Sequence, residues 1–200
     1  GSVGNRYHLN EFAHGSFFKW KGQFYHIWCY YIKKGFKFRE SIITYCHIDD
    51  EGKIVTDTNF LDQHFSNGVG QYNASWDKIE AEWFYENSSE EIIKSGTKKN
   101  GFVLSNIKNG DWVKFANVTF DKTYKSVIIN ANLTGEKGLL EFRTGGVKGR
   151  IIGKINLDAS TKNGQFKAYQ SKINKLSKLE DIYILFYTKG RGKLKLDWIK

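Results

Sequence analysis

The sequence has no methionine, only two cysteines and no long apolar segment. Cys29 and Cys46 lie in apolar stretches and have neither zinc-type spacing nor a disulfide framework, so we expect two small core residues. No run of 18 apolar residues occurs, which argues against a membrane-spanning helix. The lack of methionine and the leading Gly1-Ser2 lead us to expect a natural start upstream, where any signal peptide would also lie.

The charge is unevenly distributed along the chain. Aromatic residues make up 16% and hydrophobic residues 40% of the sequence, enough for a sizeable core. Residues 1–74 carry 8 Lys and Arg against 7 Asp and Glu, whereas residues 75–200 carry 23 against 14. This asymmetry predicts two different modules with a boundary near residue 74. A basic module suits an acidic glycan, nucleic acid or a membrane surface, but scattered lysines favour a merely solubilising surface.

Strand patterns dominate the first module. Phe24–Ile32 is a nearly continuous apolar and aromatic run, which predicts a strand buried on both faces. Arg39–Ile48 predicts a second strand, and glycine turns lie at Trp20–Gln23 and Asp49–Gly52. Strands and tight turns in this order predict a meander, the unit of a propeller blade or small barrel.

Short alternating strands fill the second module, after a Gly- and Asn-rich break at residues 66–73 that predicts a linker. Val127, Ile129, Ala131 and Leu133 share one face of a predicted strand, and further strands follow at regular spacing. The only helix signal is one turn near residues 88–91. The chain is therefore predicted to be all-β, with a β-sandwich in its second module.

Three ordered motifs in the second module resemble the family 6 carbohydrate-binding modules. They are Ile79-Glu-Ala-Glu82, Asn109-Gly-Asp-Trp-Val113 and Leu196-Asp-Trp-Ile199, and Phe166-Lys-Ala-Tyr169 resembles the paired-aromatic strand of that family. The resemblance implies a jelly-roll sandwich over residues 75–200.

The same resemblance implies a structural Ca²⁺ site. Glu80 and Glu82 are two residues apart, so on a strand both carboxylates would face one side. Asp197 would approach from the last strand, and carboxylate oxygens are ligands that Ca²⁺ prefers. The alternative is a pair of exposed acidic residues near Lys78.

The resemblance also implies a sugar cleft with two aromatic faces and an amide. Aromatic rings suit the apolar face of a pyranose. In this sequence Asn106 stands at the first aromatic position, Phe166 at the second, and Lys195 at the amide position. The departures leave two alternatives: the cleft has lost its function, or the cation at Lys195 selects an acidic sugar.

Residues 1–74 resemble the last blade of a family 43 glycoside hydrolase, a five-bladed propeller. The resemblance rests on five features in order: Phe12-Ala-His-Gly-Ser-Phe-Phe18, Lys21-Gly-Gln-Phe-Tyr25, Arg39-Glu40, Asp50-Glu-Gly-Lys-Ile54 and Gly68-Val-Gly70. It implies that His14 points to the propeller axis and that Arg39 reaches the active-site pocket. In that family the inverting acid and base come from earlier blades, so we expect no catalysis from this chain alone.

These observations support three hypotheses. The first is the C-terminal segment of a secreted or periplasmic glycosidase acting on xylan or arabinan, whose single blade must pack on the sandwich, a partner chain or the missing blades. The second is a stand-alone binding module for an acidic polysaccharide or oligosaccharide. The third, a nucleic-acid-binding domain, is disfavoured because the lysine pairs at 33–34 and 98–99 are isolated.

Overall fold

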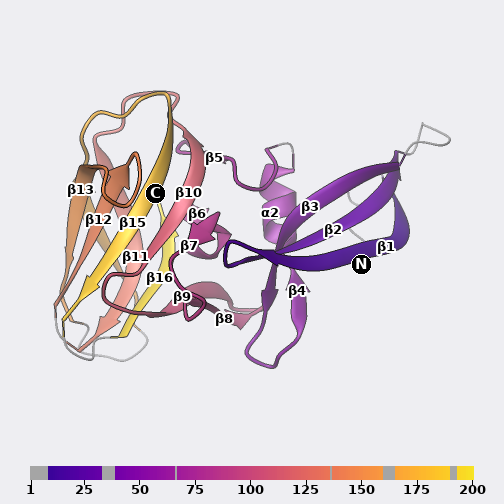
Figure 1. Cartoon of the computed structure of the whole chain (residues 1–200), viewed down its shortest axis with the longest axis horizontal. Helices are drawn as coiled ribbons and strands as arrows, with labels where there is room; N and C mark the ends of the chain where they lie inside the picture. Colours follow the sequence, from indigo (N-terminus) through magenta and orange to yellow (C-terminus); the bar gives the residue numbers. More distant parts are fainter. Residues whose placement is uncertain (1–8, 33–38, 66, 136, 160–164, 190–192) are drawn as a thin grey trace.

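The structure is a computed structural model in which residues 9–32, 39–65, 67–135, 137–159, 165–189 and 193–200 are described, except for the side chains of residues 9–14, 30–32 and 39–40. Figure 1 shows an N-terminal sheet beside a sandwich. The elements in chain order are β1 (Leu9–Trp20), β2 (Gln23–Ile32), β3 (Arg39–Ile48), β4 (Ile54–Thr56), α2 (Thr58–His64), β5 (Tyr72–Asn73), β6 (Ile79–Glu80), the 3₁₀ turn η1 (Ala81–Trp83), β7 (Glu86–Asn87), β8 (Ile93–Thr97), β9 (Gly101–Ile107), β10 (Trp112–Thr119), β11 (Ser126–Thr134), β12 (Gly138–Thr144), β13 (Arg150–Leu157), β14 (Lys167–Lys172), β15 (Leu179–Thr188) and β16 (Lys193–Ile199).

The first module is a four-stranded antiparallel meander in the order β1-β2-β3-β4, as predicted. The predicted turn between Trp20 and Gln23 joins β1 to β2. Lys21 and Gly22 adopt φ values of 51° and 80° there, the left-handed pair that a two-residue hairpin requires. A side chain at Gly22 would also collide with the Asn87 amide at 1.9 Å, so this glycine lets the hairpin approach the sandwich.

The second module is a sandwich of two sheets, which confirms the predicted fold class. One sheet has the order β13-β12-β15-β10-β5, with β7 also paired to β10. The other has the order β14-β11-β16-β9-β8, with β6 paired to β16. Neighbouring strands in both sheets come from distant parts of the sequence, so the last strand, β16, lies between β11 and β9.

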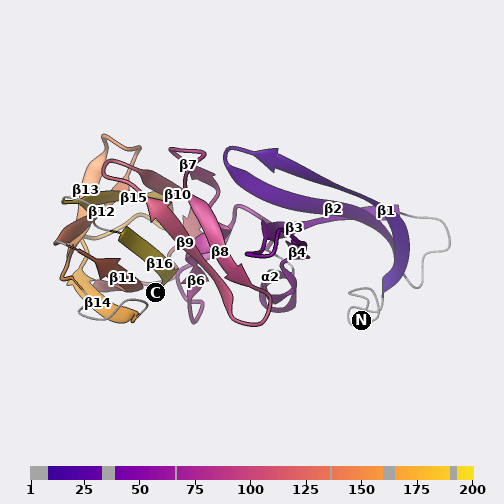
Figure 2. The same ribbon diagram turned by 90° about the horizontal axis from the view of Figure 1, so that it is seen from below.

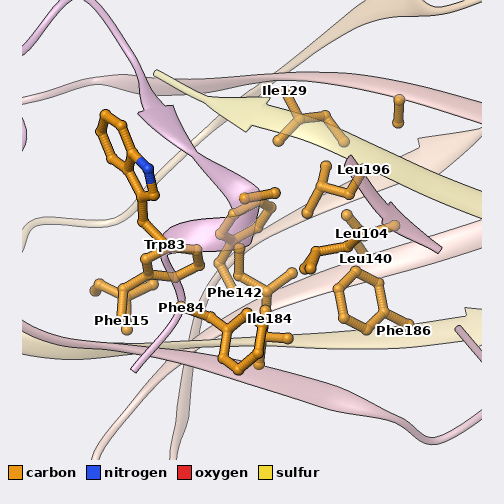
Figure 3. Packing of buried hydrophobic residues seen from close by; sticks show 14 of the residues in the cluster. Trp83, Phe84, Leu104, Phe115, Ile129, Leu140, Phe142, Ile184, Phe186 and Leu196 are labelled. Carbon is orange, nitrogen blue, oxygen red and sulfur yellow. The ribbon is translucent and has the colours of Figure 1, made fainter. Parts of the chain in front are cut away.

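The core between the two sheets follows the alternation in the sequence. Val127, Ile129, Ala131 and Leu133 of β11 are all buried, as predicted. They meet apolar residues of β10, β12 and β15 from the facing sheet, and Figure 3 shows this packing around Phe142, Ile184 and Phe186. Alternate residues of the central strands β10, β11, β12 and β15 thus contribute to one apolar layer.

Some local predictions are wrong. In the run at residues 24–32, Tyr25 is buried but the other described side chains are only half-buried, because the sheet that contains β2 is not one of the two sheets of the sandwich. Residues 88–91 form turns, whereas α2 occurs where no helix was predicted. Asp57 caps α2 by accepting a hydrogen bond from the Phe60 amide at 2.8 Å.

The described part of segment 66–73 is packed, because the Gly70 amide donates to the Tyr45 hydroxyl and Tyr72 is buried.

Polar contacts join the N-terminal sheet to the sandwich. Figure 2 shows the turn between β1 and β2 beside β7 and shows β3 and β4 near β8, while the opposite ends of β1 and β2 extend away from the sandwich. The Gln23 amide is fully buried and donates to the Glu82 carbonyl at 2.9 Å and the Phe84 carbonyl at 2.6 Å. The Asp50 amide donates to the Gly96 carbonyl at 3.0 Å. We call this boundary between the N-terminal sheet and the sandwich the joint. It also includes the hydrogen bonds of His47, Asp57, Trp83 and Lys94, which are described with the site below.

Both cysteines are free, and Cys46 is buried as expected while Cys29 is half-buried. None of the helices among the described residues is long and apolar enough to cross a membrane.

Candidate functional site

The outer face of the sheet that contains β11 and β16 carries Lys195, one of the predicted sugar-binding residues. Because Ile129, Ala131 and Leu133 point into the core, Asn132 points to the opposite face of the sheet, where it is nevertheless only 2% exposed. Asn132 pairs with Lys195 on β16, so the two side chains share this outer face. The Asn132 amide donates to the Gln165 carbonyl at 2.6 Å, which holds the segment just before β14 against β11.

Phe166 and Asn106 lie at the two sides of this row. Half-buried Phe166 directly precedes Lys167, which pairs with Ala131, and therefore lies next to Asn132. On the other side, two residues of β9 oppose Lys195 alone, which makes a β-bulge. Asn106 lies in the bulge with φ of 55°, and its amide donates to the Glu91 carbonyl at 2.8 Å. Strand pairing thus places the three predicted residues on neighbouring strands of one sheet. The side-chain amide of Asn106 already donates one hydrogen bond, to the Glu91 carbonyl.

A polar cavity of about 280 Å³ lies at the joint. The predicted cation ligands Glu80, Glu82 and Asp197 all line it, as do His47 and Asp57 from the N-terminal part. The expected strand geometry is wrong, because β6 ends at Glu80 and Glu82 lies in the 3₁₀ turn η1. Both carboxylates nevertheless reach the same cavity.

The three carboxylates differ in their partners. Glu80 forms an ion pair with Lys78 at 2.6 Å, and Asp197 accepts a hydrogen bond from Asn130 at 2.8 Å. Glu82 is buried, and its Oε2 has no hydrogen-bond partner within the described ranges. Burial, with a further contribution from Glu80, raises the pKa of Glu82 well above its usual range. No three His, Cys, Asp or Glu residues in the described part of the chain are grouped closely enough to hold a metal ion.

Asp57 connects three elements at the joint. Its Oδ2 accepts hydrogen bonds from Trp83 Nε1 at 2.6 Å and from His47 Nε2 at 2.9 Å. Burial alone would raise the pKa of Asp57, but the hydrogen bonds from His47, Phe60 and Trp83 outweigh it and the pKa is lowered. Burial and the nearby Lys94 lower the pKa of His47 to about 4, so the imidazole is neutral at pH 7.

Lys94 supplies a positive charge on the opposite side of the joint. Its ammonium donates to the Gln23 side-chain oxygen and to the Cys46 carbonyl at 2.7 Å. Burial lowers the pKa of Lys94 to about 8. The sequence pattern gave no sign of this role, because Gln23 and Lys94 are separated by 71 positions.

The predicted propeller-pocket residues are only partly placed. The backbone of His14 lies in β1 and that of Arg39 begins β3, but both side chains lie outside the described residues. Their roles stay predictions. The sequence reasoning missed Asn132, whose outward position follows from alternation but whose neighbours follow only from strand pairing.

The fold defines an all-β sandwich module of two sheets. Residues 80–200 match the sequence profile of the carbohydrate binding module family 6. The chain belongs to this family.

Relatives support both predicted resemblances. An arabinoxylan arabinofuranohydrolase of Paenibacillus polymyxa is 25% identical over 124 residues, which are 58% of this chain and 19% of the relative. A family 6 module of Clostridium stercorarium, solved with cellobiose, is 19% identical and aligns with a TM-score of 0.58 over 64% of this chain and 94% of its own.

A second solved structure covers both parts of the chain. It is a family 43 arabinoxylan arabinofuranohydrolase of Bacillus subtilis in complex with cellotetraose, at 20% identity and a TM-score of 0.60. The alignment covers 94% of this chain and 40% of the Bacillus chain. The N-terminal sheet and the sandwich therefore share the fold of part of a family 43 enzyme, and the chain spans about a fifth of the Paenibacillus relative that it matches.

Proposed function

We propose that the chain is the C-terminal part of a glycoside hydrolase that acts on xylan or arabinan and that the sandwich binds the polysaccharide. The observation that carries this proposal is the single alignment of both parts with a family 43 enzyme named for arabinoxylan. Residues 1–74 would be the last propeller blade and residues 75–200 the binding module. Earlier blades would supply the acid and base, and His14 and Arg39 would line their pocket. An enzyme with this substrate would act as a secreted or periplasmic protein.

Exposed aromatic residues on β1 support a role for further blades. Phe17, Phe18 and Trp20 are 49%, 40% and 46% exposed. Phe17 stacks on His26 at 4.3 Å, and His26 contacts Trp28 at 4.4 Å, so His26 covers one face of Phe17. Exposed apolar rings gathered on one strand are typical of a surface that packs against another part of a protein.

The sugar site of this proposal is the sheet face that carries Phe166 and Lys195. The buried Asn132 between them supports the segment before β14 through its hydrogen bond to the Gln165 carbonyl. Phe166 would stack on the apolar face of a sugar ring, and the Lys195 ammonium would donate to its oxygen atoms. Asn106, in the adjacent bulge, would offer its side-chain oxygen. The two aligned strands β11 and β16 hold these groups on a rigid sheet.

An acidic-glycan module is the second candidate function. Lys195 stands where the family has an amide, and it forms no ion pair with any residue in the described ranges. An ammonium without an ion pair on the same sheet face as an aromatic ring would favour a uronic acid over a neutral pentose.

Affinity electrophoresis separates the two candidates. The chain is run in gels that contain neutral arabinoxylan, arabinan or a uronic-acid-rich xylan, at low and moderate salt. Retardation by arabinoxylan that survives moderate salt and is lost in Phe166→Ala supports the first proposal. Retardation only by the acidic xylan, weakened by salt and lost in Lys195→Gln, favours the second. Phe18→Ala and Lys193→Gln are the matched controls, and wild-type chain that no gel retards contradicts both.

We propose further that Glu80, Glu82 and Asp197 bind a structural Ca²⁺. The unpartnered Glu82 oxygen and the lining of one cavity by all three residues support this assignment, although the three are not grouped closely enough in the described structure to hold the ion without moving. Lys78 competes with the cation for Glu80. When bound, Ca²⁺ would neutralise the buried negative charge, while the residues themselves tie β6 and η1 to the last strand.

Thermal unfolding with millimolar CaCl₂ or with EDTA tests the cation site. Calcium at 100 times its Kd would stabilise the fold by about 2.7 kcal/mol and raise the Tm. Glu82→Gln should abolish the calcium-dependent shift, whereas Glu86→Gln, which changes a surface partner of Lys21, should retain it. An equal Tm in CaCl₂ and EDTA for the wild-type chain would refute the site.

A further inference from the structure

An apolar pocket of about 80 Å³ lies between the two sheets at one end of the sandwich. Val118, near the end of β10, and Ser126 and Val127, at the start of β11, are among the residues that line it. Lys195 pairs with Asn132 toward the other end of β11, so this pocket is separate from the proposed sugar site. We call it the end pocket.

Apolar side chains form both the floor and the mouth of the end pocket. Phe142 and Ile152 line it and are only 2% and 3% exposed, so they belong to the floor. Phe120 and Leu176 also line it and are half-buried, so they belong to a mouth that solvent reaches. Because a sugar hydroxyl would find few partners on such walls, the pocket suits an apolar group instead.

The segment after β14 connects the two sheets beside the end pocket. The Asn174 amide donates to the Ile152 carbonyl on β13 of the facing sheet at 2.7 Å, and Ile173 forms an isolated bridge with Gly153. A side chain at Gly153 would come within 2.9 Å of Ile173, so glycine permits this close contact. Because Ile152 and Ile173 both line the pocket, these bonds fix the distance between its walls. The pocket is therefore preformed, as ligand pockets usually are.

Lysines surround the mouth of the end pocket. Lys200 lines the pocket, and two backbone hydrogen bonds of 2.7 Å to Ile128 hold it there. The Lys122 ammonium lies 5.5 Å from the centre of the ring of Tyr124, which also lines the pocket. The loops that carry the mouth residues hold three further lysines: Lys125, Lys175 and Lys178. None of these five lysines forms an ion pair within the part of the chain that the structure describes.

The positive charge at the mouth is only partly balanced. Asp121 is the one acidic residue in the segments 120–126 and 173–178, and it accepts a hydrogen bond from the Tyr124 hydroxyl at 2.7 Å. An excess of positive charge around an apolar pocket attracts a ligand that combines an apolar body with an anionic group.

We propose that the end pocket binds a short aliphatic carboxylate, with its chain between the sheets and its carboxylate among the lysines at the mouth. A volume of about 80 Å³ has room for roughly three groups of the size of a methylene, since a water molecule occupies about 30 Å³ of its liquid. A chain of three or four carbon atoms would therefore fill the pocket and leave the carboxylate at the mouth. The site is independent of the proposed sugar and Ca²⁺ sites.

An NMR titration of the isotope-labelled full chain with acids of increasing length tests the apolar part of the proposal. Acetate, propionate, butanoate, pentanoate and heptanoate are added at low salt. Each buried methylene should tighten binding about fourfold, so pentanoate should bind about 60-fold more tightly than acetate, and heptanoate should gain little more. The shifted amides should centre on residues 120–127, 173–176 and 199–200. An affinity that does not depend on chain length, or shifts centred elsewhere, overturns the proposal.

Pentanamide, which has the same chain without the charge, tests the carboxylate part. The wild-type chain should bind pentanoate about fivefold more tightly than pentanamide at low salt, and about equally at 1 M salt, where the charges are screened. The double variant with Lys122→Gln and Lys200→Gln should lose this preference. Lys193→Gln, at the other end of β16, is the matched control and should keep it. Equal binding of acid and amide by the wild-type chain at low salt overturns the assignment of a carboxylate.

A variant that fills the end pocket tests its location. Ile152→Phe places a larger side chain on the floor and should abolish binding of every acid in the series. Unchanged amide shifts around Leu133 and Leu194, at the other end of the core, verify that the variant is folded. Pentanoate binding retained by this folded variant would place the ligand elsewhere and overturn the proposal.

Discussion

The N-terminal sheet and the sandwich bury their aromatic residues in different ways. Phe142 and Phe186 in the sandwich are 2% and 0% exposed, because each lies between two sheets. On β1, Phe17 and Trp20 remain 49% and 46% exposed, because this sheet has no second sheet of its own. Its best-buried residues, such as Tyr45, face α2 and the sandwich. The comparison shows that the sandwich forms its own core, whereas the N-terminal sheet depends on the joint.

The largest expected effect comes from the sandwich core. Leu140→Ala removes a fully buried side chain and leaves a cavity, which should cost about 2–5 kcal/mol in the free energy of unfolding. Urea denaturation followed by tryptophan fluorescence measures this change. Because the N-terminal sheet depends on the sandwich, both parts should unfold at the lower urea concentration. Two separate transitions in the variant would contradict that dependence.

A smaller effect is expected at the joint. Trp83→Phe keeps most of the buried apolar volume but removes the indole N–H that Asp57 accepts at 2.6 Å. Loss of a hydrogen bond to a buried charged group should cost about 1.5–3 kcal/mol. The loss should appear first in the N-terminal sheet, as faster proteolysis there than in the sandwich. Ile54→Ala, which truncates a 54% exposed side chain of the same sheet, should cost less than about 0.5 kcal/mol.

The pH dependence of stability sharpens the comparison further. His47 has a folded pKa of about 4 against 6.5 for an ordinary histidine, because burial and Lys94 oppose protonation more than Asp57 favours it. Between pH 6.5 and 4 the unfolded chain therefore takes up a proton that the folded chain does not, and stability falls as the pH falls. His47→Gln, which keeps a donor for Asp57, should reduce this slope. Parallel pH profiles for the two proteins would show that His47 does not titrate in this way.

Much of the sandwich was predictable from sequence because its determinants are local. Alternation along β11 places Ile129 inward and Asn132 outward, and a glycine turn defines the β1–β2 hairpin. The helix α2 was missed because seven residues with no acidic residue in the first turn give a weak signal, although Asp57 caps it. Short amphipathic segments of this kind acquire their structure from tertiary packing.

The joint and the arrangement of the site were not predictable for a different reason. Gln23 reaches carbonyls that lie 59 and 61 positions away, and such pairings have no local pattern. Asn132 and Lys195 become neighbours only through the register of β11 and β16. The motifs identified Glu80, Glu82 and Asp197 as a group, but not the cavity that they share with the N-terminal part.

The central claim, that the N-terminal sheet depends on the joint for its core, is tested most directly by separating the two parts. Residues 1–65 and residues 66–200 are produced as separate polypeptides, and their urea unfolding is followed by circular dichroism. We predict that residues 66–200 unfold in one cooperative transition and that residues 1–65 show no transition because they are unfolded without urea. A cooperative transition for residues 1–65 alone would contradict the account.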